Sequence, residues 1–108
     1  MLPKRRRLNA SDVRRVLSVG RSLRSGVLAA KFASGPEALR VAAVVSKKVA
    51  RSAVARNRLR RALYQALSPL SGHGDLVVFV QKVPTPPLSR AFATDIFEIT
   101  KKIFPPTH

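Results

Sequence analysis

The segment SAVARNRLRRALYQAL, at residues 52–67, constrains the possible folds of this chain more than any other stretch. It contains neither Gly nor Pro, and its larger apolar residues recur at the spacing of one helix face. The residues on that face are Leu59, Leu63, Ala66 and Leu67. Apolar runs rich in Val lie before it at 39–46 and after it at 76–80. A helix between two such runs predicts a βαβ unit, with the helix packed on a sheet.

Two further features are predicted in the first half of the chain. Ser11 is a suitable N-cap residue for a short first helix, which Gly20 ends. The runs 27–34 and 39–46 are rich in apolar and strand-forming residues, and a Gly-Pro turn separates them. We therefore expect a β-hairpin between the first helix and the long one.

The last part of the chain is expected to add a final helix after the strand. Residues 83–89, VPTPPLS, cannot lie inside a sheet because proline lacks a backbone donor. Apolar residues recur at helical spacing across 92–103, and two prolines follow. The chain is long enough for one domain, residues 1–108, with helices packed on a single sheet. Residues 1–9 and 105–108 are expected to be flexible tails.

The charge balance points to a polyanionic partner. Lys and Arg total 21 against 5 Asp and Glu, which gives a formal charge of +16. A compact domain with this imbalance repels itself unless a polyanion neutralises it, so nucleic acid is the favoured partner. An anionic membrane surface is the second choice, because only 6% of the residues are aromatic and none is Trp.

Much of this charge lies in ARNRLRR, residues 55–61, within the long predicted helix. At about 100° per residue, the polar side chains spread around the helix away from the apolar stripe. These residues are Asn57, Arg58, Arg60 and Arg61. Arg56 falls near the stripe and is expected to emerge beside the sheet. No acidic residue lies between positions 40 and 70, which favours a nucleic-acid face over an ordinary solvated face.

The residues upstream of this helix extend the predicted anion-binding surface. Lys47 and Lys48 follow the Val-rich run 39–46, and Arg51 lies at the approach to the helix. Backbone N–H groups at a helix start add positive potential, so strand end, loop and helix form one anion-facing surface. The alternative is linker charge without a partner.

The sequence gives no reason to expect a catalytic or metal-binding group. Cysteine is absent, which excludes disulfides and thiolate chemistry. The acids are scattered at Asp12, Glu37, Asp75, Asp95 and Glu98. His73 lies in a turn and His108 is the last residue, so both are expected to be exposed. Without a signal-like or membrane-spanning apolar stretch, a cytoplasmic protein with no metal site of its own is expected.

The segment SKKVARSAVARNRLRRAL, residues 46–63, closely resembles the signature of the bacterial ribonuclease P protein subunit. PKRRRL near the amino end and LVVFV after the basic helix extend the resemblance. The resemblance implies an α+β fold, a two-layer α/β sandwich with a mixed four-stranded sheet and a left-handed βαβ crossover. Its element order would be α-β-β-(β)-α-β-α.

The resemblance also implies a function in tRNA 5′ maturation. In this family the RNA subunit cuts the 5′ leader from precursor tRNA with bound Mg²⁺, and the protein contributes no catalytic residue. Residues expected to bind the catalytic RNA are Lys47, Lys48, Arg51, Arg56, Asn57, Arg58, Arg60 and Arg61. Residues expected to line a cleft for the leader are Val13, Leu17, Phe32, Ser46 and Arg56. Tyr64, where the family commonly continues the basic row, is expected to stack or to hydrogen-bond.

Two other functions remain open from the sequence. A ribosomal or RNA-chaperone protein of similar fold would bind RNA without preferring a leader. An independent nuclease is a more distant alternative, because the scattered acids offer no acid–base pair or metal site.

Overall fold

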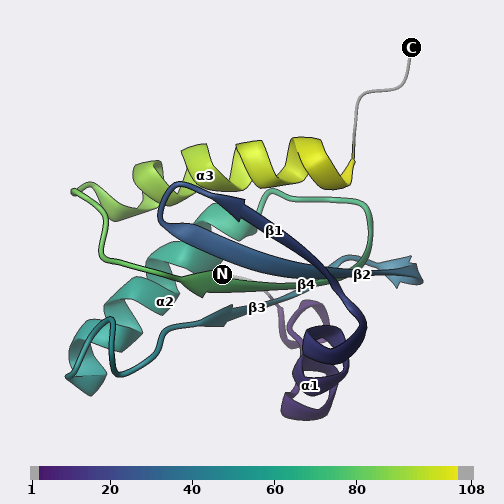
Figure 1. Cartoon of the computed structure of the whole chain (residues 1–108), viewed down its shortest axis with the longest axis horizontal. Coiled ribbons are helices and arrows are strands. Elements are labelled where there is room, and N and C mark those ends of the chain that lie inside the picture. Colours follow the sequence, from purple (N-terminus) through teal and green to yellow (C-terminus); the bar gives the residue numbers. More distant parts are fainter. Residues whose placement is uncertain (1–2, 105–108) are drawn as a thin grey trace.

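The computed structural model describes residues 3–104, which form three α-helices and a four-stranded sheet (Figure 1). The α-helices are α1 (Ala10–Val19), α2 (Ala53–Leu67) and α3 (Leu88–Ile103), with a short 3₁₀ helix, η1 (Lys4–Arg6), before them. The strands are β1 (Arg21–Ser25), β2 (Leu28–Ala38), β3 (Arg40–Val44) and β4 (His73–Val80). The mixed α+β fold is the one that the resemblance implies.

The sheet has the strand order β1-β2-β4-β3, and this order corrects one prediction. The expected hairpin between the runs 27–34 and 39–46 is wrong, because β4 lies between β2 and β3. The strand β4 is buried along almost its whole length and takes the sheet interior. The antiparallel partner of β2 on its other side is β1, a mostly exposed edge strand with one apolar residue, Leu23.

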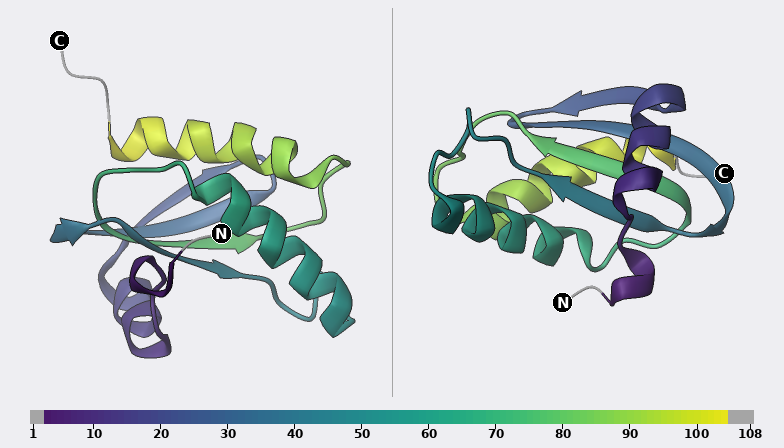
Figure 2. Two further views of the ribbon diagram at one scale, coloured as in Figure 1. Left: turned by 180° about the vertical axis from the view of Figure 1, so that it is seen from behind. Right: turned by 90° about the horizontal axis from the view of Figure 1, so that it is seen from below.

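Strands β3 and β4 are parallel and are joined through α2, so the predicted βαβ unit is confirmed. With α1 toward the reader, the chain leaves β3, passes behind the sheet through α2 and returns as β4 (Figure 2, right). This path makes the crossover left-handed, as the resemblance implies. Parallel strands in most proteins are connected with the opposite hand.

The helices divide between the two faces of the sheet (Figures 1 and 2). On one face α2 and α3 cover the main core, whose largest fully buried side chains include Leu28, Leu63 and Phe92. On the other face α1 covers a smaller cluster around Val16 and Val77. Burial of these side chains supplies the main driving force for folding. Since α1 crosses only one end of its face, part of the sheet stays uncovered there (Figure 2, right).

Helix α1 ends where the sequence predicts but begins differently. Its N-cap is Asn9, whose side-chain oxygen accepts a hydrogen bond from the Asp12 N–H at 2.8 Å, so the predicted cap at Ser11 is wrong. Asn is at least as good a cap as Ser, and its position two residues earlier extends the helix. Gly20 ends the helix as expected. A Cβ at Gly20 would lie 2.5 Å from the Val16 carbonyl oxygen, so the close approach requires glycine.

The amino-terminal residues that the structure describes are packed, contrary to the predicted tail at 1–9. Leu8 is buried, and its N–H donates to the Val41 carbonyl oxygen at 2.9 Å. Arg6 donates to the carbonyl oxygens of Ser68 and Leu70 at 3.2 and 2.7 Å. Apolar burial and these hydrogen bonds attach the segment to β3 and to the end of α2. Residues 1–2 and the predicted tail at 105–108 lie outside the described residues.

The turn between β1 and β2 gives a test of stability. Gly26 has a φ of +55°, and a Cβ there would overlap the Asp95 carboxylate, which accepts a hydrogen bond from the Val27 N–H at 3.0 Å. Gly26→Ala is expected to lower the free energy of unfolding by about 2 kcal/mol, from the left-handed backbone and the displaced carboxylate. Urea denaturation measures this loss.

Gly35→Ala is the matched control for this substitution. A Cβ at Gly35 meets nothing within 4 Å, and its φ lies outside the left-handed region. Its effect should stay within about 0.5 kcal/mol, as for most surface substitutions. Equal losses for the two variants would contradict the role assigned to the β1–β2 turn.

Candidate nucleic-acid interface

The turn before α2 presents two lysines to solvent. Strand β3 ends at Val44, and the chain then turns through 47–49, where the Ser46 carbonyl oxygen accepts from the N–H groups of Val49 and Ala50. Lys47 and Lys48 are exposed in this turn. Such a short, hydrogen-bonded turn holds both cations beside the start of the helix.

Helix α2 separates its apolar and basic sides as the sequence predicts. Its N-cap is Ser52, whose hydroxyl oxygen accepts from the Ala55 N–H at 3.0 Å. The buried residues are Leu59, Leu63 and Leu67. The polar residues on its other sides are Asn57, Arg58 and Arg61, which are exposed, and Arg60, which is half-buried.

No carboxylate neutralises this basic side within the described residues. The ion pairs among residues 3–104 use the carboxylates of Asp12, Asp75 and Glu98, all outside α2 and its turn. We call the polar residues of α2 and its turn the basic helix surface; it consists of Lys47, Lys48, Arg51, Asn57, Arg58, Arg60 and Arg61. Uncompensated arginines on one ordered helix suit the geometry of phosphate groups.

Two arginines of α2 make hydrogen bonds inside the chain. Arg60 donates to the side-chain oxygen of Asn57, so the Asn57 amide keeps its N–H₂ group free to donate elsewhere. Arg56 turns back on the preceding loop, where one of its terminal nitrogens donates to the carbonyl oxygens of Ala50 and Arg51 at 3.1 and 2.7 Å. Arg56 therefore stabilises the loop that follows the two lysines, and its position at a cleft edge stays a prediction.

Tyr64 hydrogen-bonds, one of the two expected roles. Its hydroxyl oxygen accepts from the Ala43 N–H at 3.2 Å, on the free edge of β3. The ring also packs against the main core. Tyr64 thus attaches α2 to the edge of the sheet and satisfies a backbone donor that would otherwise face outward.

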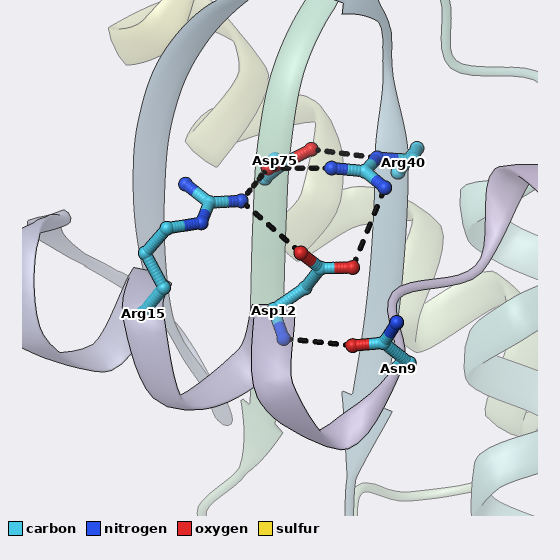
Figure 3. Close-up of polar contacts among 5 residues, drawn as sticks. All are labelled: Asn9, Asp12, Arg15, Arg40 and Asp75. Atoms are coloured by element: carbon cyan, nitrogen blue, oxygen red, sulfur yellow. Dashed lines mark hydrogen bonds and ion pairs between the residues drawn. The ribbon is translucent and has the colours of Figure 1, made fainter.

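A network of charged side chains attaches α1 to the sheet (Figure 3). Asp75, on β4, is 7% exposed and accepts two hydrogen bonds from Arg40, both at 3.1 Å, and one from Arg15. Asp12 on α1 pairs with the same two arginines, at 3.6 Å from Arg15 and 3.4 Å from Arg40. Every member of the network therefore contacts an opposite charge.

The network raises the pKa of its two arginines. Hydrogen bonds to Asp75 are the main cause that raises the pKa of Arg15 and Arg40 above the ordinary value, and partial burial opposes them. A raised pKa in the folded state stabilises the fold at every pH below the ordinary arginine pKa. This contribution is lost only when the pH rises through the raised pKa, so it should be constant across the neutral range.

The sheet beside α1 is open and carries cations and a ring. Every second residue of each strand faces the α1 side of the sheet. On this side Phe79 of β4 pairs with Ala29 of β2 and with Val44 of β3 in the strand register. A shallow hollow of about 530 Å³ lies over this region. Its lining residues are Ser22, Leu23, Arg24, Ala29, Ala30, Lys31 and Phe79. Leu23 and Ala30 turn their side chains to the main core on the opposite face. We call the others, Ser22, Arg24, Ala29, Lys31 and Phe79, together with Val44, the open sheet face.

The predicted cleft residues divide between the two faces of the sheet. Val13 packs on the α1 cluster beside Phe79, and Leu17 is 37% exposed on the same helix. Phe32 lies on the other face, where its ring packs edge-on to Phe104 at 5.6 Å between centroids. The assignment of Phe32 to a cleft beside α1 is therefore wrong. Side chains alternate along β2, and Phe32 has the parity of the core residues.

The ring on the α1 side is Phe79, which the sequence reasoning missed. In LVVFV the residues Leu76, Val78 and Val80 face the main core, so the residues between them face α1. Alternation was the signal that could have found Phe79. It went unnoticed because five consecutive apolar residues give no polar positions to mark the two faces.

Among residues 3–104, no three side chains of His, Cys, Asp or Glu gather closely enough to hold a metal ion. None of the helices in this range is both long enough and apolar enough to cross a lipid bilayer.

An α+β domain with a basic helix that contains no acid and with an open sheet face defines a small RNA-binding protein. The family model described as Ribonuclease P matches residues 2–102. The chain therefore belongs to the ribonuclease P protein family, and its role is in tRNA 5′ maturation. No curated protein sequence matches it.

Solved structures share the fold. The RNase P protein of Staphylococcus aureus has a TM-score of 0.76 and 19% identity, over 92% of this chain and 95% of that one. A second structure of the S. aureus protein has a TM-score of 0.74 and 20% identity, over 100% of this chain and 98% of that one. At these identities the likeness concerns the arrangement of helices and strands.

Proposed function

We propose that this chain is the protein subunit of a ribonucleoprotein endonuclease and binds the catalytic RNase P RNA through the basic helix surface. The observation that carries the proposal is the continuous set of cations on α2 and its turn, with no acid among them. These cations would displace counterions from the RNA, which is the main source of affinity in such complexes. The fixed turn and the Ser52 cap keep the cations in place before binding.

The open sheet face is the proposed site for the single-stranded 5′ leader of precursor tRNA. Phe79 offers a ring to the bases, while Lys31 and Arg24 offer positive charge to the phosphates. Val13 and Leu17 on α1 form the apolar wall beside it. Mature tRNA lacks the leader, so contacts here would favour binding of substrate over product.

The RNA carries the chemistry in this proposal, in the cytoplasm where the precursor is processed. Magnesium would supply the charge that activates water and stabilises the leaving oxygen. In this proposal the Mg²⁺ is held mainly by the RNA subunit. The cations of the protein instead reduce phosphate repulsion between the RNA and its substrate.

A direct test combines the chain with the RNase P RNA of the same cell at low Mg²⁺. Cleavage of precursor tRNA should rise when the protein is added, and the complex should bind precursor more tightly than mature tRNA. Equal affinity for the two would reject the leader site. Cleavage by the protein after removal of all RNA would reject the assignment of the chemistry.

Arg58→Ala combined with Arg61→Ala tests the basic helix surface. Both side chains are exposed on α2, so the fold should be preserved. RNA affinity is expected to fall, and the plot of log affinity against log salt to become shallower by about 0.9 per lost phosphate contact. Filter binding at several salt concentrations measures the slope.

Lys82→Ala combined with Arg90→Ala is the charge-matched control. These side chains are also exposed but lie outside α2 and the open sheet face. The control should leave the salt slope unchanged. A similar slope change in both double variants would mean that total charge, and not the α2 surface, determines the affinity.

A further inference from the structure

The segment Lys4–Arg7 contains four consecutive cations. One of their side chains points into the protein and the other three point to solvent. Arg6 points inward and donates to the Ser68 and Leu70 carbonyl oxygens at the end of α2. Lys4, Arg5 and Arg7 are exposed. One arginine thus anchors the segment while its neighbours remain available for a ligand.

The backbone of this segment is fixed as well. The N–H groups of Arg6 and Arg7 donate to the carbonyl oxygens of Pro3 and Lys4 at 3.0 and 3.1 Å, which closes the η1 turn. Arg7 then bridges Val41 on the free edge of β3, and Leu8 is buried. A ligand would therefore meet cations carried on a backbone that is already ordered, which lowers the entropic cost of binding.

The exposed cations surround a hollow beside α2. It has a volume of about 500 Å³. Its lining residues are Lys4, Arg5, Arg7, Leu8, Asn9, Asp12, Arg40 and Tyr64. The acid among them, Asp12, already pairs with Arg15 and Arg40, so it does not neutralise the amino-terminal cations. Tyr64 lies one helical turn beyond Arg60 and Arg61. The hollow thus borders the basic helix surface.

We propose that Lys4, Arg5 and Arg7 form a second site for RNA phosphates, and that Arg6 is its positioning residue. The inference rests on the proposed binding of the catalytic RNA and extends the contact beyond α2. The sugar-phosphate backbone of one RNA segment spans α2, Tyr64 and the η1 hollow. Because Arg6 joins η1 to the end of α2, the spacing between the two groups of cations is fixed.

The test compares Lys4→Ala combined with Arg5→Ala against the Lys82→Ala and Arg90→Ala control. Both variants lose one lysine and one arginine, all four of them exposed. For the first variant, the salt slope of binding to the RNase P RNA should become shallower by nearly two units, about 0.9 for each lost contact. The control should keep the wild-type slope, and equal slopes for the two variants would overturn the inference.

Arg6→Lys tests the positioning role without changing the net charge. A lysine cannot reach both carbonyl oxygens in the fork geometry of a guanidinium. RNA affinity should fall at least threefold although the charge is the same, and the circular dichroism spectrum should remain that of the wild type. Wild-type affinity in this variant would reject a positioning role for Arg6.

A tethered cleavage reagent locates the contact independently. The chain has no cysteine, so Lys4→Cys and Lys82→Cys each provide a single attachment point. A radical-generating iron chelate at position 4 should cut the RNA near the segment protected by α2, and the same chelate at position 82 should not. Suppose that the wild type binds the RNA, that the α2 variant has a shallower salt slope, and that the chelate at position 4 does not cut the RNA. This result would reject the further inference but not the proposed function. Failure of wild type to bind the RNA would reject the proposed function itself.

Discussion

Replacing Asp75 with alanine is expected to lower the free energy of unfolding by about 2 kcal/mol, because two arginines lose their shared carboxylate. Asp75 is 7% exposed, whereas the side chains of Arg15 and Arg40 are 45% and 27% exposed. Breaking a fully buried pair costs about 3 to 5 kcal/mol, and contact with solvent reduces that value here. Urea denaturation at neutral pH measures the change.

The loss should concern α1 in particular, since Arg15 and Asp12 connect this helix to β3 and β4 through the same network (Figure 3). Hydrogen exchange of the α1 amides is expected to quicken more than that of α2. Glu98→Ala removes the exposed Lys101–Glu98 pair on α3 and should cost less than about 0.5 kcal/mol. Similar losses for the two substitutions would show that burial of Asp75 has no special effect.

Phe79→Leu is expected to reduce the preference of the holoenzyme for precursor over mature tRNA by roughly tenfold. Stacking of one base on an aromatic ring contributes about 1 to 3 kcal/mol, and leucine removes it. Leucine keeps an apolar side chain where Phe79 packs on the α1 cluster, so the fold should be retained. Equilibrium binding of the two tRNAs to the complex measures the ratio.

Phe97→Leu is the matched control for the loss of a ring. Phe97 is 61% exposed on α3, outside the open sheet face, and its removal should leave the ratio unchanged. Affinity for mature tRNA should stay the same in both variants. If Phe79→Leu keeps the wild-type ratio of precursor to mature tRNA affinity, Phe79 does not stack on the leader. This result would not affect the proposed binding of RNA phosphates by α2.

The elements with strong local signals could be predicted from the sequence. Helix α2 follows from its apolar spacing, its capping serine and the absence of Gly and Pro, and the structure places it at Ala53–Leu67. The same apolar spacing predicts that the residues of the basic side of α2 lie outside the core. The strand partners could not be predicted, because β2 pairs across long sequence distances with β4, and no local rule selects that pairing.

The sequence also did not show which face of the sheet each strand residue occupies. In β2, Ala29 and Ala30 are identical residues that face opposite sides of the sheet, so residue type did not mark Phe32 as a core residue on the α3 side. The amino-terminal cations resembled a solvated tail, since the carbonyl oxygens that Arg6 contacts are 62 and 64 residues away.

The charge, the basic helix and the family follow from residue type and short-range spacing, so they can be read from the amino-acid sequence. The position of Phe79 on the open side of the sheet, and the contact of Arg6 that joins η1 to the end of α2, are visible only in the folded chain. Both depend on contacts between distant residues, and these become favourable only when the whole core assembles.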